Sequence, residues 1–271
     1  MDATGSIKEL RKLAEGRGAE IFAWDEGSVL RLFRDAHSSE AVDREMAVMR
    51  AVSDVVPFVP AVLGRAEVDG RPGIILERID GSDLLTQLET RPWTVRSVGA
   101  ICGTLHARLH EVTAPPVLPA LVEVAPTLLD RLPQDVAVLA RRALASLPVG
   151  DRLCHGDFHP ANVLNSSRGP VVIDWPNAVR GDPHADVART LMLLRLGALP
   201  PGTSIVVRVG AAVARRLVAS SYRRAYARTR ALDDDLVRRW AVVVAALRLL
   251  EDLPGERPAL LRLVRTAAAE P

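Results

Sequence analysis

The chain has 271 residues, of which 48% are hydrophobic and 25% are charged. These proportions are ordinary for a globular protein, and they exclude a disordered chain. At roughly 150 residues per domain, the length indicates about two domains or one large one. The 35 basic and 33 acidic residues leave a formal charge of +2, which is too balanced to predict binding to nucleic acid.

Neither a disulfide framework nor a membrane segment is expected. Cys102 and Cys154 are the only cysteines, and they do not form a CxxC pair. The N-terminus lacks the apolar run of a signal peptide. The longest apolar stretch, residues 241–250, contains Arg248 and is too short to span a bilayer. We therefore expect a cytoplasmic protein that does not bind membranes.

The first 80 residues are predicted to form a small sheet and one main helix, after a short helix over residues 1–15 and a turn at Gly16 and Gly18. Asp-Glu-Gly at 25–27 and Asp-Gly at 69–70 each separate two β-rich runs and favour hairpin turns. The expected hairpins pair residues 21–24 with 28–33 and residues 61–68 with 72–79. Between the hairpins, residues 38–53 carry apolar side chains at helical spacing.

After Asp80 and Gly81 the pattern becomes mainly helical. The predicted helical ranges are 98–112, segments within 120–147, and 186–271 with a break at the Pro-Pro-Gly of 200–202. Two short apolar runs, 151–156 and 170–175, interrupt the helices as a small β insertion. A sheet followed by helices indicates an α+β chain with two lobes.

The densest group of chemically capable residues is HGDFHPAN at 155–162, which is followed by the apolar run VVIDW at 171–175. Gly156 and Pro160 make the first segment a loop rather than a helix. An amide and a carboxylate, Asn162 and Asp174, suit Mg²⁺, which prefers oxygen ligands and keeps several waters. The remaining carboxylate, Asp157, can then accept a proton from a hydroxyl. For each residue alone, a capping role in a polar turn is the simpler interpretation, but the joint spacing favours chemistry.

These two segments resemble the catalytic and metal-binding segments of the aminoglycoside phosphotransferase and choline kinase-like family. The resemblance implies a two-lobed protein-kinase-like fold, with a small antiparallel-sheet N-lobe over 1–79 and a larger, mainly helical C-lobe over 80–271. It also implies that Asp157 is the catalytic base and that Asn162 and Asp174 bind Mg²⁺. In the same family pattern, His155 braces the loop.

The N-terminal motifs match the family less completely. Gly16 and Gly18 lie where a phosphate-covering loop belongs, but the third glycine of GxGxxG is absent. By the resemblance, Glu45 on the predicted helix pairs with the basic residue that binds the ATP phosphates. That basic residue is a lysine in the family and Arg31 here, which keeps the charge but changes the geometry. Backbone groups around Glu77 and Ile79 are expected to bind the adenine.

We therefore predict an ATP- and Mg²⁺-dependent phosphotransferase that acts on a hydroxyl of a small molecule: an aminoglycoside-like compound, a sugar or another metabolite. Arg31 and the incomplete glycine loop leave open a catalytically weak kinase-like protein that binds a nucleotide or a partner. A metal-dependent hydrolase that uses Asp157, His159 and Asp174 is a third possibility. The expected partners are a nucleotide and a small-molecule acceptor, and neither nucleic acid nor membrane.

Three further residues receive structural interpretations. His106 and His110 are spaced i, i+4 on a predicted helix, but no glutamate completes an HExxH zinc motif. They are therefore expected in the core or on the helix surface. Asp186, in a segment that resembles the family pattern, is expected to have a structural role at the start of a helix.

Overall fold

The computed structural model describes residues 3–5, 7–16, 18–34, 39–196, 204–253 and 255–267. Arg17 of the glycine-bearing turn and the Pro-Pro-Gly break at 200–202 lie outside the described residues. By its internal contacts the chain forms two compact units, Met1–Ser82 with Leu164–Pro176 and Asp83–Val163 with Asn177–Pro271. The first unit thus holds the predicted lobe over 1–79 and, in addition, a later segment that the sequence-based division placed in the second lobe.

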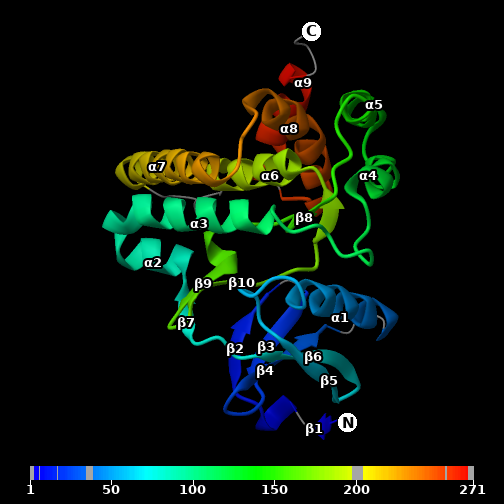
Figure 1. Ribbon diagram of the computed structural model, residues 1–271, viewed down its shortest axis with the longest axis vertical. Coiled ribbons are helices and arrows are strands. Elements are labelled where there is room, and N and C mark those ends of the chain that lie inside the picture. Colours follow the sequence, from blue (N-terminus) through cyan, green and yellow to red (C-terminus); the bar gives the residue numbers. More distant parts are fainter. Residues whose placement is uncertain are drawn as a thin grey trace. The chain divides into compact units, whose positions relative to one another are not determined.

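The first unit contains a six-stranded sheet in the order β1-β5-β6-β4-β3-β2 (Figure 1). Its strands are β1 (Ala3–Gly5), β2 (Lys12–Glu15), β3 (Ala19–Ala23), β4 (Ser28–Phe33), β5 (Val62–Val68) and β6 (Arg71–Glu77). β1 pairs with β5 in parallel, and the other neighbours are antiparallel. Both expected hairpins, β3–β4 and β5–β6, are therefore confirmed.

The helix expected over residues 1–15 is wrong. This segment instead forms β1, a single turn of 3₁₀-helix η1 (Ile7–Glu9), and the edge strand β2. β2 pairs with β3, and the Lys12 ammonium lies 2.7 Å from the Glu20 carboxylate on that strand. Pairing with a neighbouring strand therefore overrides the helical propensity of a short, charged segment.

The side chains of β4 alternate between the two faces of the sheet. Leu30 and Leu32 are fully buried and pack with Phe22, Ala66 and Val68 in one core cluster. Because successive side chains of a strand point to opposite faces, Arg31 lies on the other face. That face meets helix α1 (Ser39–Ser53), which contacts β5 and β6 and confirms the helix predicted over 38–53.

A second, three-stranded sheet has the order β10-β9-β7, with β7 (Gly81–Asp83), β9 (Val163–Ser166) and β10 (Gly169–Val172). The Val172 N–H donates to the Phe58 carbonyl at 2.8 Å. In the turn between β9 and β10, Arg168 binds both carboxylate oxygens of Glu77, at 2.7 and 3.0 Å. These bonds tie the β9–β10 hairpin to the rest of the first unit, and Asp174 lies two residues after the end of β10.

The second unit is mainly helical, as expected. Its α-helices are α2 (Leu84–Thr90), α3 (Val95–Leu109), α4 (Leu121–Leu129), α5 (Gln134–Leu144), α6 (Pro183–Leu196), α7 (Ile205–Thr229), α8 (Asp234–Arg248) and α9 (Arg257–Ala267). Single 3₁₀ turns are η2 (Pro92–Thr94), η3 (Pro160–Asn162) and η4 (Leu249–Glu251). Within the described residues, no helix is both long and apolar enough to cross a membrane.

Helices α3 and α7 lie side by side along their lengths (Figure 1). Glycines of α3 permit this close approach. A Cβ at Gly103 would stand 2.2 Å from the Tyr222 carbonyl oxygen, and one at Gly99 would stand 2.5 Å from that of Val218. Any larger side chain at these positions would force the two helices apart.

A two-stranded antiparallel sheet, β8 (Arg152–Cys154) with β11 (Val179–Gly181), precedes helix α6. The loop with Asp157 begins where β8 ends, and Asn162 closes the η3 turn before β9. The two apolar runs of the sequence thus correspond to β8 and β10, and the loop between them is irregular as predicted.

Candidate active site

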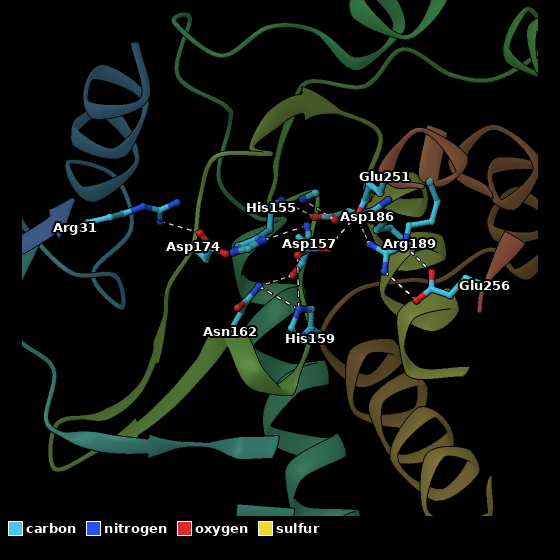
Figure 2. Close-up of polar contacts among 12 residues, drawn as sticks. Arg31, His155, Asp157, His159, Asn162, Asp174, Asp186, Arg189, Glu251 and Glu256 are labelled. Carbon is cyan, nitrogen blue, oxygen red and sulfur yellow. Dashed lines mark hydrogen bonds and ion pairs between the residues drawn. The ribbon is translucent and has the colours of Figure 1, made fainter. Parts of the chain in front are cut away.

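In the first unit, Arg31 makes ion pairs with two acids. Its Nη2 lies 3.1 Å from Oε1 of Glu45 on α1. Its Nη1 lies 2.8 Å from Oδ1 of Asp174, a contact drawn in Figure 2. The side chains of Arg31 and Glu45 are each only 14% exposed. The expected proximity of Arg31 and Glu45 is therefore present, and Asp174 is a second partner that the sequence did not indicate.

Asp174 has an unusual backbone conformation. Its φ is 69°, in the left-handed region that residues other than glycine seldom adopt. Such a conformation costs about 1–3 kcal/mol and tends to persist at functional sites, where the surrounding structure holds it. The side chain is 42% exposed, so one carboxylate oxygen can pair with Arg31 while the group remains accessible to a ligand.

In the second unit, the loop with Asp157 is fixed through its backbone. The Asp186 carboxylate of α6 accepts N–H bonds from His155 at 2.5 Å and from Gly156 at 3.0 Å. Gly156 has a φ of 77°, and a Cβ there would lie 2.2 Å from the Asn177 carbonyl oxygen. Only glycine fits this position. The His155 ring in turn accepts the Asp157 N–H through Nδ1, at 3.2 Å.

Asn162 is held by its amide nitrogen. Nδ2 donates to the Asp157 backbone carbonyl at 2.9 Å and lies 3.3 Å from Nε2 of His159 (Figure 2). Both contacts use the nitrogen and orient the amide, so the carbonyl oxygen is left as the ligating atom. This arrangement fits a hard cation, which takes oxygen ligands.

The Asp157 carboxylate is largely buried and charged. Burial alone would raise its pKa, but the nearby His159 side chain and the positive charge of Arg189 outweigh burial and hold the pKa well below its usual value. Arg189 Nη2 lies 3.2 Å from Asp157 Oδ1. The group is therefore an anion at neutral pH, as a proton acceptor requires.

Asp186 also anchors a buried network. Its Oδ2 lies 3.0 Å from Nε2 of His106 and 3.3 Å from Nε2 of His110. The Nδ1 atoms of these two rings lie 2.7 Å from the hydroxyls of Tyr222 and Tyr226, respectively.

A carboxylate can only accept hydrogen bonds, so each histidine is assigned as a neutral Nε2–H tautomer whose Nδ1 accepts a tyrosine O–H. The ligand atoms of His106, His110 and Asp186 are close enough to bind a metal ion. They are, however, fully paired with one another and with the tyrosines, as expected for a structural core.

Glu77, in the predicted adenine-binding segment, has a structural role. Its N–H donates to the Ala61 carbonyl at 2.9 Å, and its carboxylate accepts the Ala61 N–H at 3.1 Å as well as the two bonds from Arg168. The Glu77 side chain therefore joins β6 to the β9–β10 hairpin. Contacts of adenine with the backbone near Glu77 and Ile79 stay a prediction.

Arg189 was missed in the sequence analysis. It lies three residues after Asp186 on α6, so helical spacing places both side chains on the same face, toward the loop with Asp157. This spacing is the signal that could have identified it. Its second partner, Glu251, is 62 residues away and could not have been found from spacing.

Comparison with known proteins gives matching relatives. In an alignment of 127 residues the sequence is 35% identical to streptomycin 6-kinase from Streptomyces griseus, and the match covers 42% of this chain and 40% of that protein. In an alignment of 140 residues it is 36% identical to hydroxyurea phosphotransferase from Kitasatospora aureofaciens, and the match covers 46% of this chain and 41% of that protein. The matched stretches thus span about two-fifths of each relative's length.

Among solved structures, amicoumacin kinase hAmiN in complex with AMP-PNP, Ca²⁺ and Ami matches with a TM-score of 0.62 and 16% identity, over 97% of this chain and 89% of that one. At this identity the likeness is one of fold, and it confirms the protein-kinase-like architecture. The model of the Phosphotransferase enzyme family matches residues 9–232. That match covers far more than half of the sequence, and the chain therefore belongs to the phosphotransferase enzyme family.

Proposed function

We propose that this protein is an ATP-dependent phosphotransferase that moves the γ-phosphate to a hydroxyl of a small molecule. The observation that carries the proposal is the geometry of the Asp157 loop. Asp157 is a charged carboxylate, and the amide of Asn162 is bonded through its nitrogen to the Asp157 backbone. A proton acceptor and an oxygen ligand for a cation are thus supplied by one rigid loop.

The residues also fit Mg²⁺. Asn162 offers its amide carbonyl, and Asp174 offers a partly exposed carboxylate on strained backbone. We propose these two residues as the magnesium ligands, with the remaining positions filled by water and phosphate oxygens. Bound there, the ion would neutralise the charge of the phosphates during transfer.

The other residues act by positioning and by charge. Arg31 presents a guanidinium, which binds phosphate oxygens in a bidentate manner, and Glu45 holds it. Asp157 orients the acceptor hydroxyl and takes its proton as the oxygen attacks the γ-phosphorus. In this proposal residues 1–79 bind the nucleotide, with backbone groups near Glu77 and Ile79 on the adenine, and residues 80–271 bind the acceptor.

The acceptor is a hydroxylated small molecule, because a carboxylate base has a proton to remove from a hydroxyl. The names of the two relatives, a streptomycin kinase and a hydroxyurea phosphotransferase, make antibiotics and small N-hydroxy compounds the first compounds to test. Sugars and other hydroxylated metabolites follow. The proposal thus names the reaction and leaves the choice of acceptor to a screen.

The test is a screen with the intact protein, Mg²⁺ and ATP against aminoglycosides, hydroxyurea, sugars and amino alcohols. ADP release is the readout, and mass spectrometry identifies the phosphorylated product. We expect at least one acceptor to stimulate ADP release, and the stimulation should be lost in Asp157→Asn. Nucleotide binding without any turnover would favour the catalytically weak binding protein. Hydrolysis of a phosphoester without nucleotide would favour the metal-dependent hydrolase.

A further inference from the structure

We propose that Arg189 is the positioning residue for Asp157, and that a chain of alternating charges reaching from the turn before α9 holds Arg189 in place. This inference rests on the proposed role of Asp157 as proton acceptor. Neither the family match nor the sequence motif assigns a role to Arg189.

The chain of alternating charges consists of five side chains in the second unit: Asp157, Arg189, Glu251, Arg248 and Glu256. Arg189 Nη2 contacts Asp157 Oδ1 at 3.2 Å and also pairs with Oε1 of Glu251 (Figure 2). Glu251 Oε2 pairs with Arg248 Nη1 at 2.5 Å. Arg248 then binds Glu256 through two bonds, Nε–Oε2 at 2.8 Å and Nη2–Oε1 at 3.1 Å. The bidentate end is the most rigid part, since planar guanidinium and carboxylate match in geometry.

The side chains in this chain of alternating charges are largely buried, so they can hold Arg189 in a fixed position. The side chains of Arg248 and Glu256 are 8% and 10% exposed, and that of Arg189 is 11% exposed. The Nε of Arg189 is buried and has no hydrogen-bond partner among the described residues. Leaving a buried donor unpaired destabilises the folded state, because the group loses its hydrogen bonds to water. The position that Arg189 gives to Asp157 accounts for an arginine at this site despite that cost.

The charges of the chain leave Asp157 negative. Three carboxylates and two guanidiniums sum to one net negative charge, and Glu251 offsets the charge of Arg189. Without Glu251, the guanidinium would act on Asp157 alone and weaken it as a proton acceptor. Glu251 therefore lets Arg189 fix the carboxylate without fully neutralising it.

The contact with Arg189 selects one oxygen of Asp157. Oδ1 is held by the guanidinium, whereas Oδ2 lies 3.6 Å from His159 Nε2, which is too long for a hydrogen bond. Oδ2 is therefore the oxygen that faces the acceptor hydroxyl. A carboxylate that rotates freely about its χ2 angle would present this oxygen only part of the time.

The test compares Arg189→Gln and Arg189→Lys with the wild type. The reaction is hydrolysis of Mg–ATP with no added acceptor: a water oxygen bonds to the γ-phosphorus, ADP leaves with the electrons of the broken bond, and Asp157 takes the water proton. We expect kcat to fall about 10- to 100-fold in Arg189→Gln, with the KM for ATP unchanged and partial recovery in Arg189→Lys. The control Arg223→Gln breaks the Arg223–Asp234 ion pair elsewhere in the unit and should leave kcat unchanged.

A double-mutant cycle separates this inference from the proposed function. If Arg189 acts through Asp157, then Arg189→Gln should cost little further turnover in an Asp157→Asn background. If Asp157→Asn alone keeps full activity, the proposed base fails. If Asp157→Asn is impaired but Arg189→Gln has wild-type kcat, the role of Arg189 fails while the base remains.

A structural readout does not depend on activity. The crystal structure of Arg189→Gln, or of Glu251→Gln should the first variant fail to fold, should show Asp157 in more than one rotamer. The His155 and Gly156 bonds to Asp186 should stay intact in that structure. A single Asp157 rotamer identical to that of the wild type would overturn the proposal.

Discussion

The Arg31 guanidinium and the Asp174 carboxylate form an ion pair, with 2.8 Å between Nη1 and Oδ1, although 143 residues separate them in sequence. The proposed phosphate ligand and the proposed metal ligand thus neutralise each other. A bound metal–nucleotide complex would give each a new partner of opposite charge, phosphate for Arg31 and Mg²⁺ for Asp174. The exchange keeps both charges compensated, which limits its electrostatic cost.

Replacing Arg31 should weaken nucleotide binding. Arg31 uses a different nitrogen for Glu45 and for Asp174, and a lysine has only one nitrogen for both. We expect Arg31→Ala to lower ATP affinity or turnover several-fold or more, and Arg31→Lys to lower it as well. Titration with a fluorescent ATP analogue, followed by steady-state assays, measures both.

The matched control for this change is Arg71→Lys. Arg71 lies in the same sheet, is 17% exposed, and pairs with Glu20 at 2.8 Å. It should bind nucleotide like the wild type. A gain of activity in Arg31→Lys would indicate a kinase that has lost function through the arginine.

Asp157→Asn should reduce turnover by about 10²–10⁴-fold, the usual contribution of a positioned general base. The amide keeps the shape of the side chain but cannot take the proton. Nucleotide affinity should stay nearly unchanged. Single-turnover assays with Mg–ATP test both statements, and full activity of the variant would remove Asp157 from the mechanism.

Asp174→Ala should impair Mg²⁺-dependent nucleotide binding more than Asn162→Ala does. A carboxylate attracts a dication more strongly than a neutral amide does. Titrating an ATP analogue with and without Mg²⁺ gives the difference. Asp69→Ala controls for backbone strain, since Asp69 also has a positive φ of 48°. If Asp174→Ala bound the metal–nucleotide complex as tightly as the wild type, its metal role would be wrong.

The buried histidines should make stability depend on pH. Burial, with a contribution from the neighbouring His106, lowers the pKa of His110 to about 4, and burial also lowers the pKa of His106. In the unfolded chain both rings titrate near pH 6.5. As the pH falls below about 6.5, the unfolded state therefore binds protons that the folded state does not bind. The free energy of unfolding decreases as a result, down to about pH 4.

The depressed pKa of Asp186 also lowers stability as the pH falls, in a more acidic range. The folded state keeps this carboxylate charged, whereas the unfolded state takes up a proton there. Urea unfolding between about pH 7.5 and 4.5 should show a loss of up to about 3 kcal/mol from His110. In His110→Gln, which has no ring to protonate, the slope over this range should be smaller. An equal slope in both proteins would contradict the assignment of a neutral His110.

Gly103→Ala should destabilise the second unit. The new methyl group would stand 2.2 Å from the Tyr222 carbonyl oxygen, and crowding of this kind costs about 1–3 kcal/mol. Gly210→Ala is the control, since a Cβ there meets nothing within 4 Å; it should stabilise α7 by about 0.5–1 kcal/mol. Thermal unfolding of the two variants should therefore shift in opposite directions.

Features that depend on local sequence were predicted well. The hairpin turns, helix α1 and the loop with Asp157 and Asn162 follow from turn residues, periodicity and spacing. The pairing of Arg31 with Glu45, 14 residues apart in sequence, needed the family resemblance as well, since a strand and a helix can meet in many ways. The segment 1–15 was wrongly predicted because the edge pairing of β2 with β3 cannot be read from the segment itself.

Features that depend on distant partners were not predicted. His106 and Tyr222 are 116 residues apart, as are His110 and Tyr226, and no local pattern links them. The Asp157–Arg189–Glu251 contacts likewise join a loop, a helix and a later turn. Such contacts follow from how helices pack, so the sequence could identify the reacting groups but not the side chains that hold them.

Arg31 also changes which covalent chemistry the proposed nucleotide site can undergo. Reagents that acylate or form imines need a free amine, which a lysine supplies when it loses its proton, whereas a guanidinium stays protonated in proteins. The protein has only two lysines, Lys8 in the η1 turn and Lys12 at the first residue of β2. Amine-directed ATP derivatives that label a phosphate-binding lysine should therefore leave this site unmodified, even when they occupy it.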